Sequence, residues 1–301
     1  MLECETAYLI SRKVRPNMAA YDHVTIIGVG LIGGSIGLAL RAHGLATEIV
    51  GVGRRETSLA TARAVGAVDR TTTDLTAGVD QANLVVVCAP VCSITDLVSK
   101  VAESCPADCL ITDAASTKAK IVAQIEQRLA PALNGPSFVG SHPLAGDHRA
   151  GPQHARGDLF EGRVAVVTPT ATTPAEAIEK VSQFWQQLGA RVLKMSPAEH
   201  DQVVAVTSHL PHLVAFALAG STPESAGPLA ASGWYDTTRI AAAEPELWQQ
   251  IFASNDQALF EALDNFEAMV SSLKRAILDN DKVALVDLLQ EAKRIRDALG
   301  S

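Results

Sequence analysis

Short runs of aliphatic and β-branched residues alternate with amphipathic stretches from Tyr21 to about residue 195. Runs of this kind predict strands, and the stretches between them predict helices. Strands are expected at 24–29, 48–52, 84–89, 109–114, 138–142, 164–169 and 191–195, with helices beginning near Ile32, Thr57, Ile94 and Lys118 and after Pro174. The alternation is typical of βαβ units, so residues 21–195 are predicted to form an α/β domain around a doubly wound parallel sheet.

The pattern changes after Ser196, where long segments with a 3.6-residue period replace the strand-like runs. Residues 196–301 are therefore predicted to form an all-helical domain that serves substrate binding and dimerisation. Its first long helix, 200–220, is apolar nearly all round, which predicts burial beyond what one small helical domain supplies. We expect a homodimer that forms through the C-terminal helices. Residues 1–20 are expected to be a disordered arm, and translation starting at Met18 stays open.

Composition narrows the class of ligand. The chain has 301 residues, of which 48% are hydrophobic and 19% charged, and its net charge is −8. An acidic chain lacks the clustered Lys and Arg that nucleic acids need, so a small metabolite is the expected partner. No apolar run reaches the roughly 18 residues of a membrane span, and charges interrupt the first twenty residues. We expect no membrane association and a cytoplasmic protein.

Two Cys-x3-Cys pairs, Cys88 with Cys92 and Cys105 with Cys109, raise the alternative of a structural zinc site. Cys88 ends one predicted strand and Cys109 begins another, which favours small apolar fillers in a reduced interior. We predict no metal site.

A glycine-rich turn joins the first strand to the first helix, with Gly28, Gly30 and Gly33 in the pattern G-x-G-x-x-G. The first glycine permits a tight turn, the second lets the backbone approach a pyrophosphate, and the third lets helix and strand pack closely. The phosphates of a dinucleotide would lie at the helix N-terminus. This predicts a Rossmann-type domain whose cofactor site also includes Leu31, Ile32, Ala89 and Pro90.

The end of the second strand bears on the choice of dinucleotide. A carboxylate there would bind the ribose hydroxyl of NAD, but the chain has Gly53, Arg54 and Arg55. Two guanidinium groups suit a 2′-phosphate, so NADP is favoured and NAD remains possible. Two solvated arginines, one of them paired with Glu56, are the alternative.

Four further segments gather polar residues beyond the carboxyl ends of the strands: DAASTK, GSHPLAG, AEHDQVVAVTSHLPH and DTTRIA. With this combination the chain from Tyr21 onward resembles the prephenate and arogenate dehydrogenases of tyrosine biosynthesis. The resemblance implies an NAD(P)-dependent dehydrogenase that oxidises and decarboxylates prephenate to 4-hydroxyphenylpyruvate. The alternative within the family is an arogenate dehydrogenase, which produces tyrosine directly.

The resemblance also implies roles for single residues. His142 matches the catalytic histidine that accepts or shares the substrate hydroxyl proton, and Ser116 matches the serine that hydrogen-bonds this histidine. Arg239 matches the arginine that binds a substrate carboxylate, while His200 and Ser208 match substrate-contacting residues. Taken alone, a Ser at a strand end is more often an N-cap, here for the helix at Lys118, and both roles can coexist in Ser116. His209 and His212 are expected to be buried, hydrogen-bonded histidines beside a kink at Pro211.

The chain departs from the family after Gly146, where Asp147, His148 and Arg149 follow. Asp147 would attract the ammonium group of arogenate, and His148 or Arg149 would balance the extra negative charge of prephenate. Prephenate is slightly favoured because that activity commonly accompanies this set of motifs.

Two other functions remain as alternatives. A 3-hydroxyacid dehydrogenase would typically carry a catalytic Lys on the first helix after the sheet domain, where this chain has His200. A dinucleotide-binding regulator without catalysis is disfavoured by the presence of Ser116, His142 and Arg239.

Overall fold

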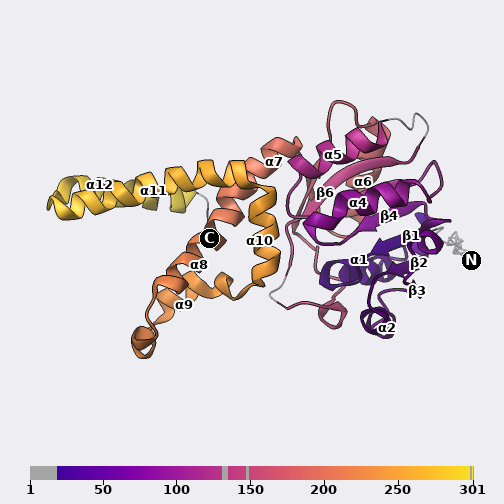
Figure 1. The fold of residues 1–301 in the computed structure, drawn as a ribbon, viewed down its shortest axis with the longest axis horizontal. Helices are drawn as coiled ribbons and strands as arrows, with labels where there is room; N and C mark the ends of the chain where they lie inside the picture. The colour runs from indigo at the N-terminus through magenta and orange to yellow at the C-terminus, as the bar shows by residue number, and fades with distance from the viewer. Residues whose placement is uncertain (1–18, 131–134, 147–148, 299, 301) are drawn as a thin grey trace, which may run out of the picture.

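The computed structural model describes residues 19–130, 135–146, 149–298 and 300. A sheet with helices on both faces forms one part of the molecule, and the helices from α7 onward form the other (Figure 1). Asp147 and His148, which were expected to contact the substrate, lie outside the described residues.

The sheet has eight strands in the order β3-β2-β1-β4-β5-β6-β7-β8. Their bounds are β1 Tyr21–Ile27, β2 Ala46–Val52, β3 Arg70–Thr72, β4 Leu84–Val87, β5 Leu110–Asp113, β6 Ser137–Pro143, β7 Val164–Thr168 and β8 Arg191–Lys194. All neighbouring strands pair in parallel except β6 and β7, which are antiparallel. The predicted doubly wound parallel sheet is confirmed, but the sequence did not indicate this antiparallel pair. The described part of the connection between β6 and β7 holds only a short 3-10 turn, Pro152–His154, and no crossover helix of the kind that parallel strands need.

The sheet is covered by α1 Leu31–Ala42, α2 Glu56–Ala64, α3 Leu75–Val79, α4 Val91–Ala102, α5 Ala119–Leu129 and α6 Ala175–Gln187. The predicted helix starts lie close to these, but β3 and α3 were missed. Both elements are short, and β3 is a polar edge strand of three residues, so neither leaves a hydrophobic period in the sequence.

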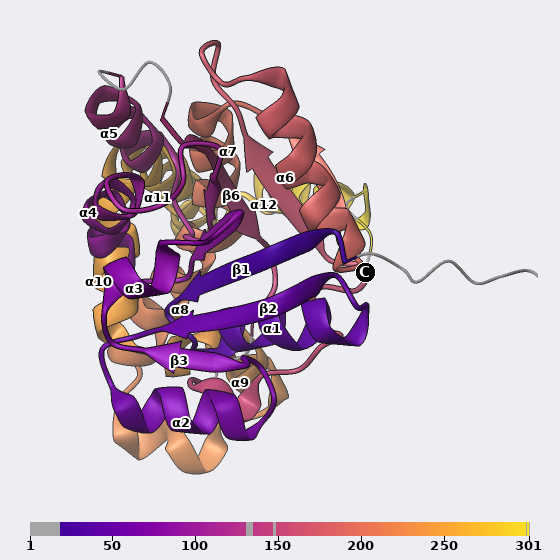
Figure 2. The same ribbon diagram turned by 90° about the vertical axis from the view of Figure 1, so that its right-hand side faces the viewer.

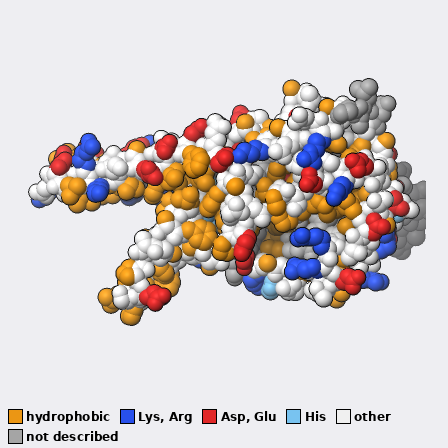
Figure 3. All heavy atoms as spheres, viewed as in Figure 1, with side chains coloured by type: hydrophobic (Ala, Val, Ile, Leu, Met, Phe, Trp, Pro, Cys, Tyr) orange, Lys and Arg blue, Asp and Glu red, His pale blue; other side chains and the backbone are white. Residues whose placement is uncertain are grey.

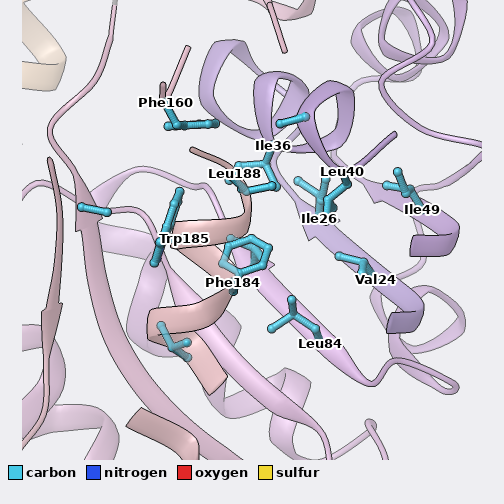
Figure 4. Packing of buried hydrophobic residues seen from close by; sticks show 14 of the residues in the cluster. Val24, Ile26, Ile36, Leu40, Ile49, Leu84, Phe160, Phe184, Trp185 and Leu188 are labelled. Carbon is cyan, nitrogen blue, oxygen red and sulfur yellow. The ribbon is translucent and has the colours of Figure 1, made fainter. Parts of the chain in front are cut away.

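Two hydrophobic clusters fill the two faces of the sheet. One joins β1 to α1 and α6 through large buried side chains such as Ile26, Ile36 and Trp185 (Figure 4). The other lies under α4 and α5 on the opposite face (Figure 2). Trp248 and Ile251 from the helical part belong to this second cluster, so the helical part packs onto the α4 face of the sheet.

The helical part consists of α7 Pro197–Val204, a π-helical turn Ala205–His209, α8 Leu210–Ser221, α9 Ser232–Thr238, α10 Pro245–Ser254, α11 Asp256–Leu278 and α12 Lys282–Ala298. A π-turn inserts one extra residue into a helix and is frequent at functional sites. It lies just before Pro211, where a kink was expected, because proline has no N–H to donate to the preceding turn.

Two helical arms, one of α11 and α12 and one of α8 and α9, project from the rest of the molecule (Figure 1). Hydrophobic side chains line the notch between them (Figure 3). Only Ala215 of α8 is buried, although the sequence predicted burial on every side. The continuous helix Pro197–Ser221 is long and apolar enough to cross a membrane by length and composition, with 22% of its apolar window buried. It also carries the fully buried His200, which ties its first turns to the sheet domain.

Candidate active site

The three glycines of the turn meet three different steric requirements. Gly28 has φ +89°, and a Cβ there would lie 2.2 Å from the carbonyl oxygen of Cys88. A Cβ on Gly33 would lie 2.4 Å from the carbonyl oxygen of Gly28, so α1 packs closely on β1. A Cβ on Gly30 would meet nothing within 4 Å, which leaves open space above the backbone.

That open space fits the pyrophosphate of a dinucleotide. Gly30 is the N-cap of α1, and no side chain caps the helix, so the N–H groups of Leu31 and Ile32 at its first turn suit an anion. The turn lies where β1 neighbours β4 and the strand order reverses. Ala89 and Pro90 follow the carboxyl end of β4 beside it, in the crevice where such sheets bind their ligands.

Arg54 and Arg55 are exposed after β2, and Arg55 is the N-cap of α2. Among the described residues neither guanidinium forms an ion pair, and Glu56 pairs with neither. Both charges are therefore available to an anionic ligand.

His142 stands near the end of β6 and forms a hydrogen bond with His200 of α7 that joins the two parts of the molecule. His142 Nδ1 and His200 Nε2 are 2.9 Å apart, and His200 Nδ1 lies 2.7 Å from Asp201 Oδ1. His200 is fully buried and Asp201 nearly so, while His142 is half-buried. The three side chains form a relay that begins at a buried carboxylate and ends at the crevice.

The partners in the relay assign its protons. An ionised carboxylate only accepts, so His200 Nδ1 carries a proton and its Nε2 accepts from His142 Nδ1. The remaining nitrogen of His142, Nε2, then presents a lone pair and has no hydrogen-bond partner among the described residues. Burial, together with the neighbouring His200 and Lys118, lowers the pKa of His142 well below its usual value. The imidazole is thus neutral and able to accept a proton.

Asp201 is fixed by the N-terminus of α5. The backbone N–H groups of Lys118 and Ala119 donate to its two carboxylate oxygens at 2.8 Å each, and Asn255 Nδ2 donates to its carbonyl oxygen at 2.8 Å. A side chain from the helical part therefore caps a helix of the sheet domain. Ser116, which was considered for this role, forms no cap: the N-cap of α5 is Lys118, whose own side chain makes no capping hydrogen bond.

Ser116 is half-buried at the end of β5, and the described residues show no hydrogen bond from it to His142. The structure also places His200 behind His142 with both ring nitrogens bonded to protein, unlike the expected direct contact with substrate. The expected shared face of His200 and Ser208 assumed an unbroken α-helix, whereas Ser208 lies in the π-turn.

The other histidines of the helical part line a neighbouring region. Asn255 Nδ2 donates to His209 Nδ1 at 3.2 Å, and burial lowers the pKa of His209 to about 4. His212 Nδ1 donates to the carbonyl oxygen of Ser208 at 2.9 Å, and its ring stacks on Trp248 with centroids 3.5 Å apart. Burial lowers the pKa of His212, and the nearby charge of Arg239 adds to this. The expected buried, hydrogen-bonded state matches His209, whereas His212 is hydrogen-bonded but only half-buried.

Sequence reasoning missed four contributors to the site: Asp113, Lys118, Asp201 and Asn255. The signal for three of them was present, because Asp113 and Lys118 open and close the DAASTK segment and Asp201 follows His200 directly. Among the described residues no group of three or more His, Cys, Asp or Glu side chains is arranged to hold a metal ion.

A dinucleotide site at the switch point of the sheet, with a proton-accepting histidine at its edge and a helical part packed against it, defines a dinucleotide-dependent dehydrogenase. The family model for the prephenate dehydrogenase nucleotide-binding domain matches residues 36–194, and that for the prephenate dehydrogenase dimerization domain matches residues 196–291. The chain belongs to the prephenate dehydrogenase family.

Curated relatives agree with these matches. The chain is 35% identical to the cyclohexadienyl dehydrogenase of Zymomonas mobilis over 94% of this chain and 97% of the relative. It is 33% identical to the prephenate dehydrogenase of Bacillus subtilis over 92% of this chain and 76% of that one.

Solved structures are similar along nearly the whole chain. Prephenate dehydrogenase from Aquifex aeolicus, in complex with hydroxyphenyl propionate and NAD+, superposes with a TM-score of 0.85 at 33% identity, covering 92% of this chain and 98% of that one. Arogenate dehydrogenase from Synechocystis gives a TM-score of 0.78 at 30% identity, covering 92% and 99%. The expected oxidoreductase with a nicotinamide dinucleotide is confirmed at the level of the family.

Proposed function

We propose that this dehydrogenase oxidises and decarboxylates prephenate to 4-hydroxyphenylpyruvate, with His142 as the proton acceptor. The observation that carries the proposal is the Asp201–His200–His142 relay, which leaves Nε2 of a neutral imidazole without a partner among the described residues, near the carboxyl end of β6. A positioned imidazole in this state suits the removal of a hydroxyl proton.

The reaction breaks an O–H, a C–H and a C–C bond of the substrate, and His142 is the group of this chain that accepts the proton. His142 Nε2 takes the proton of the ring hydroxyl as a carbonyl forms at that carbon and its hydride leaves. The bond to the ring carboxylate then breaks, carbon dioxide departs, and the electron pair of that bond moves through the ring to the carbonyl oxygen, which regains a proton from His142 and completes the aromatic phenol. A bound nicotinamide dinucleotide supplies the hydride acceptor. The positive charge that develops on His142 is stabilised through His200 by the carboxylate of Asp201.

The substrate carboxylates need cations. Arg239 is exposed on the helical part, close enough for its charge to act on His212. We assign Arg239 to a substrate carboxylate, which a guanidinium binds through two parallel hydrogen bonds. Ser208 and Ser116 are assigned to the substrate and the His142 region respectively, as the resemblance implies.

We assign NADP as the preferred cofactor because Arg54 and Arg55 form no ion pair among the described residues. They follow the second strand, at the place where NAD-binding domains carry a carboxylate. The Arg54→Ser and Arg55→Ser variants should lose affinity for NADP by about tenfold or more while retaining affinity for NAD. Equal losses with both cofactors would overturn the NADP assignment. The complex of the Aquifex aeolicus relative contains NAD+, so both cofactors are compared.

Arogenate is the second candidate substrate, favoured by the similarity to the Synechocystis arogenate dehydrogenase and to the Zymomonas cyclohexadienyl dehydrogenase. Steady-state assays with each substrate and each cofactor separate the candidates, and activity with arogenate alone would overturn prephenate. His142→Asn should lower turnover by several orders of magnitude with nearly unchanged cofactor affinity. Full activity of this variant would remove His142 from the mechanism.

We further propose that the active form is a homodimer in which a second copy covers the exposed apolar side chains of the helical arms. The match to a dimerization domain and the exposed Phe260, Ile277 and Leu278 of α11 support this. The cytoplasmic location expected from the sequence stays a prediction.

A further inference from the structure

Beneath His142 lies an ion pair that the proposed reaction does not use. Lys118 Nζ donates to Asp113 Oδ2, and both side chains are fully buried, with 0% exposure. A buried ion pair contributes little to stability compared with apolar residues of the same volume, because desolvating two charges is costly. Its presence next to the relay therefore calls for a role beyond packing.

The pair is connected to His142 through the backbone of β6. Asp113 Oδ1 accepts from the N–H of Ser141 at 3.0 Å, and a Cβ on Gly140 would lie 3.3 Å from Cδ of Lys118. The aliphatic chain of Lys118 thus lies beside Gly140, and Asp113 binds Ser141, the residue directly before His142. Asp113 Oδ2 also accepts from the N–H of Ala115 at 3.0 Å, which fixes the carboxylate.

Lys118 is also connected to the other end of the relay. Its own backbone N–H donates to Asp201 Oδ1 at 2.8 Å, the oxygen that faces His200 Nδ1. One residue therefore fixes the carboxylate that orients the relay and places an ammonium group near the imidazole that ends it. Among the described residues, the charged and titratable groups around His142 are His200 and Asp201 of α7, His209 of the π-turn, Asp113 at the end of β5 and Lys118 after it.

We propose that Lys118 is a positioning residue of this dehydrogenase: its backbone fixes Asp201, and its buried ammonium group keeps His142 neutral and able to accept a proton. The proposal rests on the proposed role of His142. The ammonium group disfavours a second positive charge nearby, so His142 stays unprotonated at pH values where an ordinary histidine gains a proton. Burial lowers the pKa of Lys118, and Asp113 opposes this by holding the ammonium in place.

The test is the titration of His142 in the full-length holoenzyme, followed by NMR of ring-labelled histidine, with Lys118→Met as the variant. Removing the ammonium group should raise the pKa of His142 by about one unit or more. The acidic limb of the kcat/KM profile should move to higher pH by the same amount. Lys120→Met is the matched control, because Lys120 is half-exposed on the same helix and pairs with Asp256. It should move neither measurement.

Lys118→Met leaves Asp113 buried without its partner, so the double variant Asp113→Asn/Lys118→Met provides a second test that removes both charges. His142 should still titrate above its wild-type value in the double variant, because the ammonium is the member of the pair whose charge acts on it. If the pKa of His142 is unchanged in both variants while kcat is lowered at every pH, the proposal is overturned, and Lys118 only supports the packing of the site. Full activity of His142→Asn would instead overturn the proposed function, which separates the two failures.

Discussion

Replacing Asp201 by Asn tests the relay at its origin. Asp201 accepts hydrogen bonds from His200 Nδ1, Lys118 N and Ala119 N, at 2.7, 2.8 and 2.8 Å. An amide accepts only on its oxygen, so an NH2 at the Oδ1 position leaves His200 and Lys118 without an acceptor, and an NH2 at the Oδ2 position leaves Ala119 without one. When His200 Nδ1 loses its acceptor, the proton of the His200 ring moves to Nε2, and His142 Nδ1 must accept it as a hydrogen bond. His142 Nε2 then carries the proton of its own ring and no longer acts as a base.

A wrong histidine tautomer lowers kcat by about 10⁴-fold in the Ser-His-Asp triad of serine proteases, where a carboxylate likewise orients a histidine. We expect Asp201→Asn to lower kcat by about 10²–10⁴-fold, equivalent to about 3–5 kcal/mol of transition-state stabilisation. The lost helix cap should cost about 1 kcal/mol of unfolding free energy as well. Affinity for the dinucleotide should be nearly unchanged, because the glycine turn lies on another element.

The assay is steady-state reduction of the dinucleotide at saturating substrate, with cofactor affinity measured separately by fluorescence titration. Asp256→Asn is the matched control, since Asp256 also joins the helical part to α5, through Lys120 at 2.6 Å, but is 47% exposed. An exposed pair of this kind contributes less than about 1 kcal/mol, so the control should keep its kcat within about twofold. A kcat of Asp201→Asn within about threefold of wild type would refute the relay.

Three further predictions concern the fold and its assembly. Gly33→Ala should lower the thermal unfolding midpoint, because its Cβ would lie 2.4 Å from the carbonyl oxygen of Gly28. Gly30→Ala should leave the midpoint unchanged and weaken dinucleotide binding. A lower midpoint in Gly30→Ala than in Gly33→Ala would contradict the assigned glycine roles. Phe260→Glu combined with Ile277→Glu should shift the protein to a monomer in analytical ultracentrifugation, and a dimer of unchanged affinity would move the interface elsewhere. Burial lowers the pKa of His209 to about 4, so the unfolded chain binds a proton below pH 6.5 that the folded chain refuses. Unfolding free energy measured in urea should therefore fall by up to about 3 kcal/mol between pH 6.5 and 4, and this part of the loss should vanish in His209→Gln.

The order of strands and helices in the sheet domain followed from hydrophobic periodicity, because each element buries one face in a two-sided core. The antiparallel direction of β7 did not follow from periodicity, because strand direction depends on the path of the connection and not on the residues within the strand. The short polar β3 carries no periodic signal at all.

The candidate site was predictable where a residue has a motif around it, as with Gly28 in its turn and His142 in GSHPLAG. The relay was not predictable, because His142 and Asp201 come from different parts of the chain. They enter one hydrogen-bonded chain only when α7 packs against α5. The sequence pattern also could not show that His200 is turned toward His142, since the contact depends on where the two parts dock.

The cap on α5 has a consequence for exchanging parts between related enzymes. Because one part of the molecule supplies the helix N-terminus and the other supplies the carboxylate, neither holds a complete site by itself. A chimera that joins this helical part to a foreign sheet domain would be active only if that domain presents two free N–H groups at the matching helix start. The N-terminus of α5 and Asp201 must therefore be exchanged together if a recombined enzyme is to keep the site.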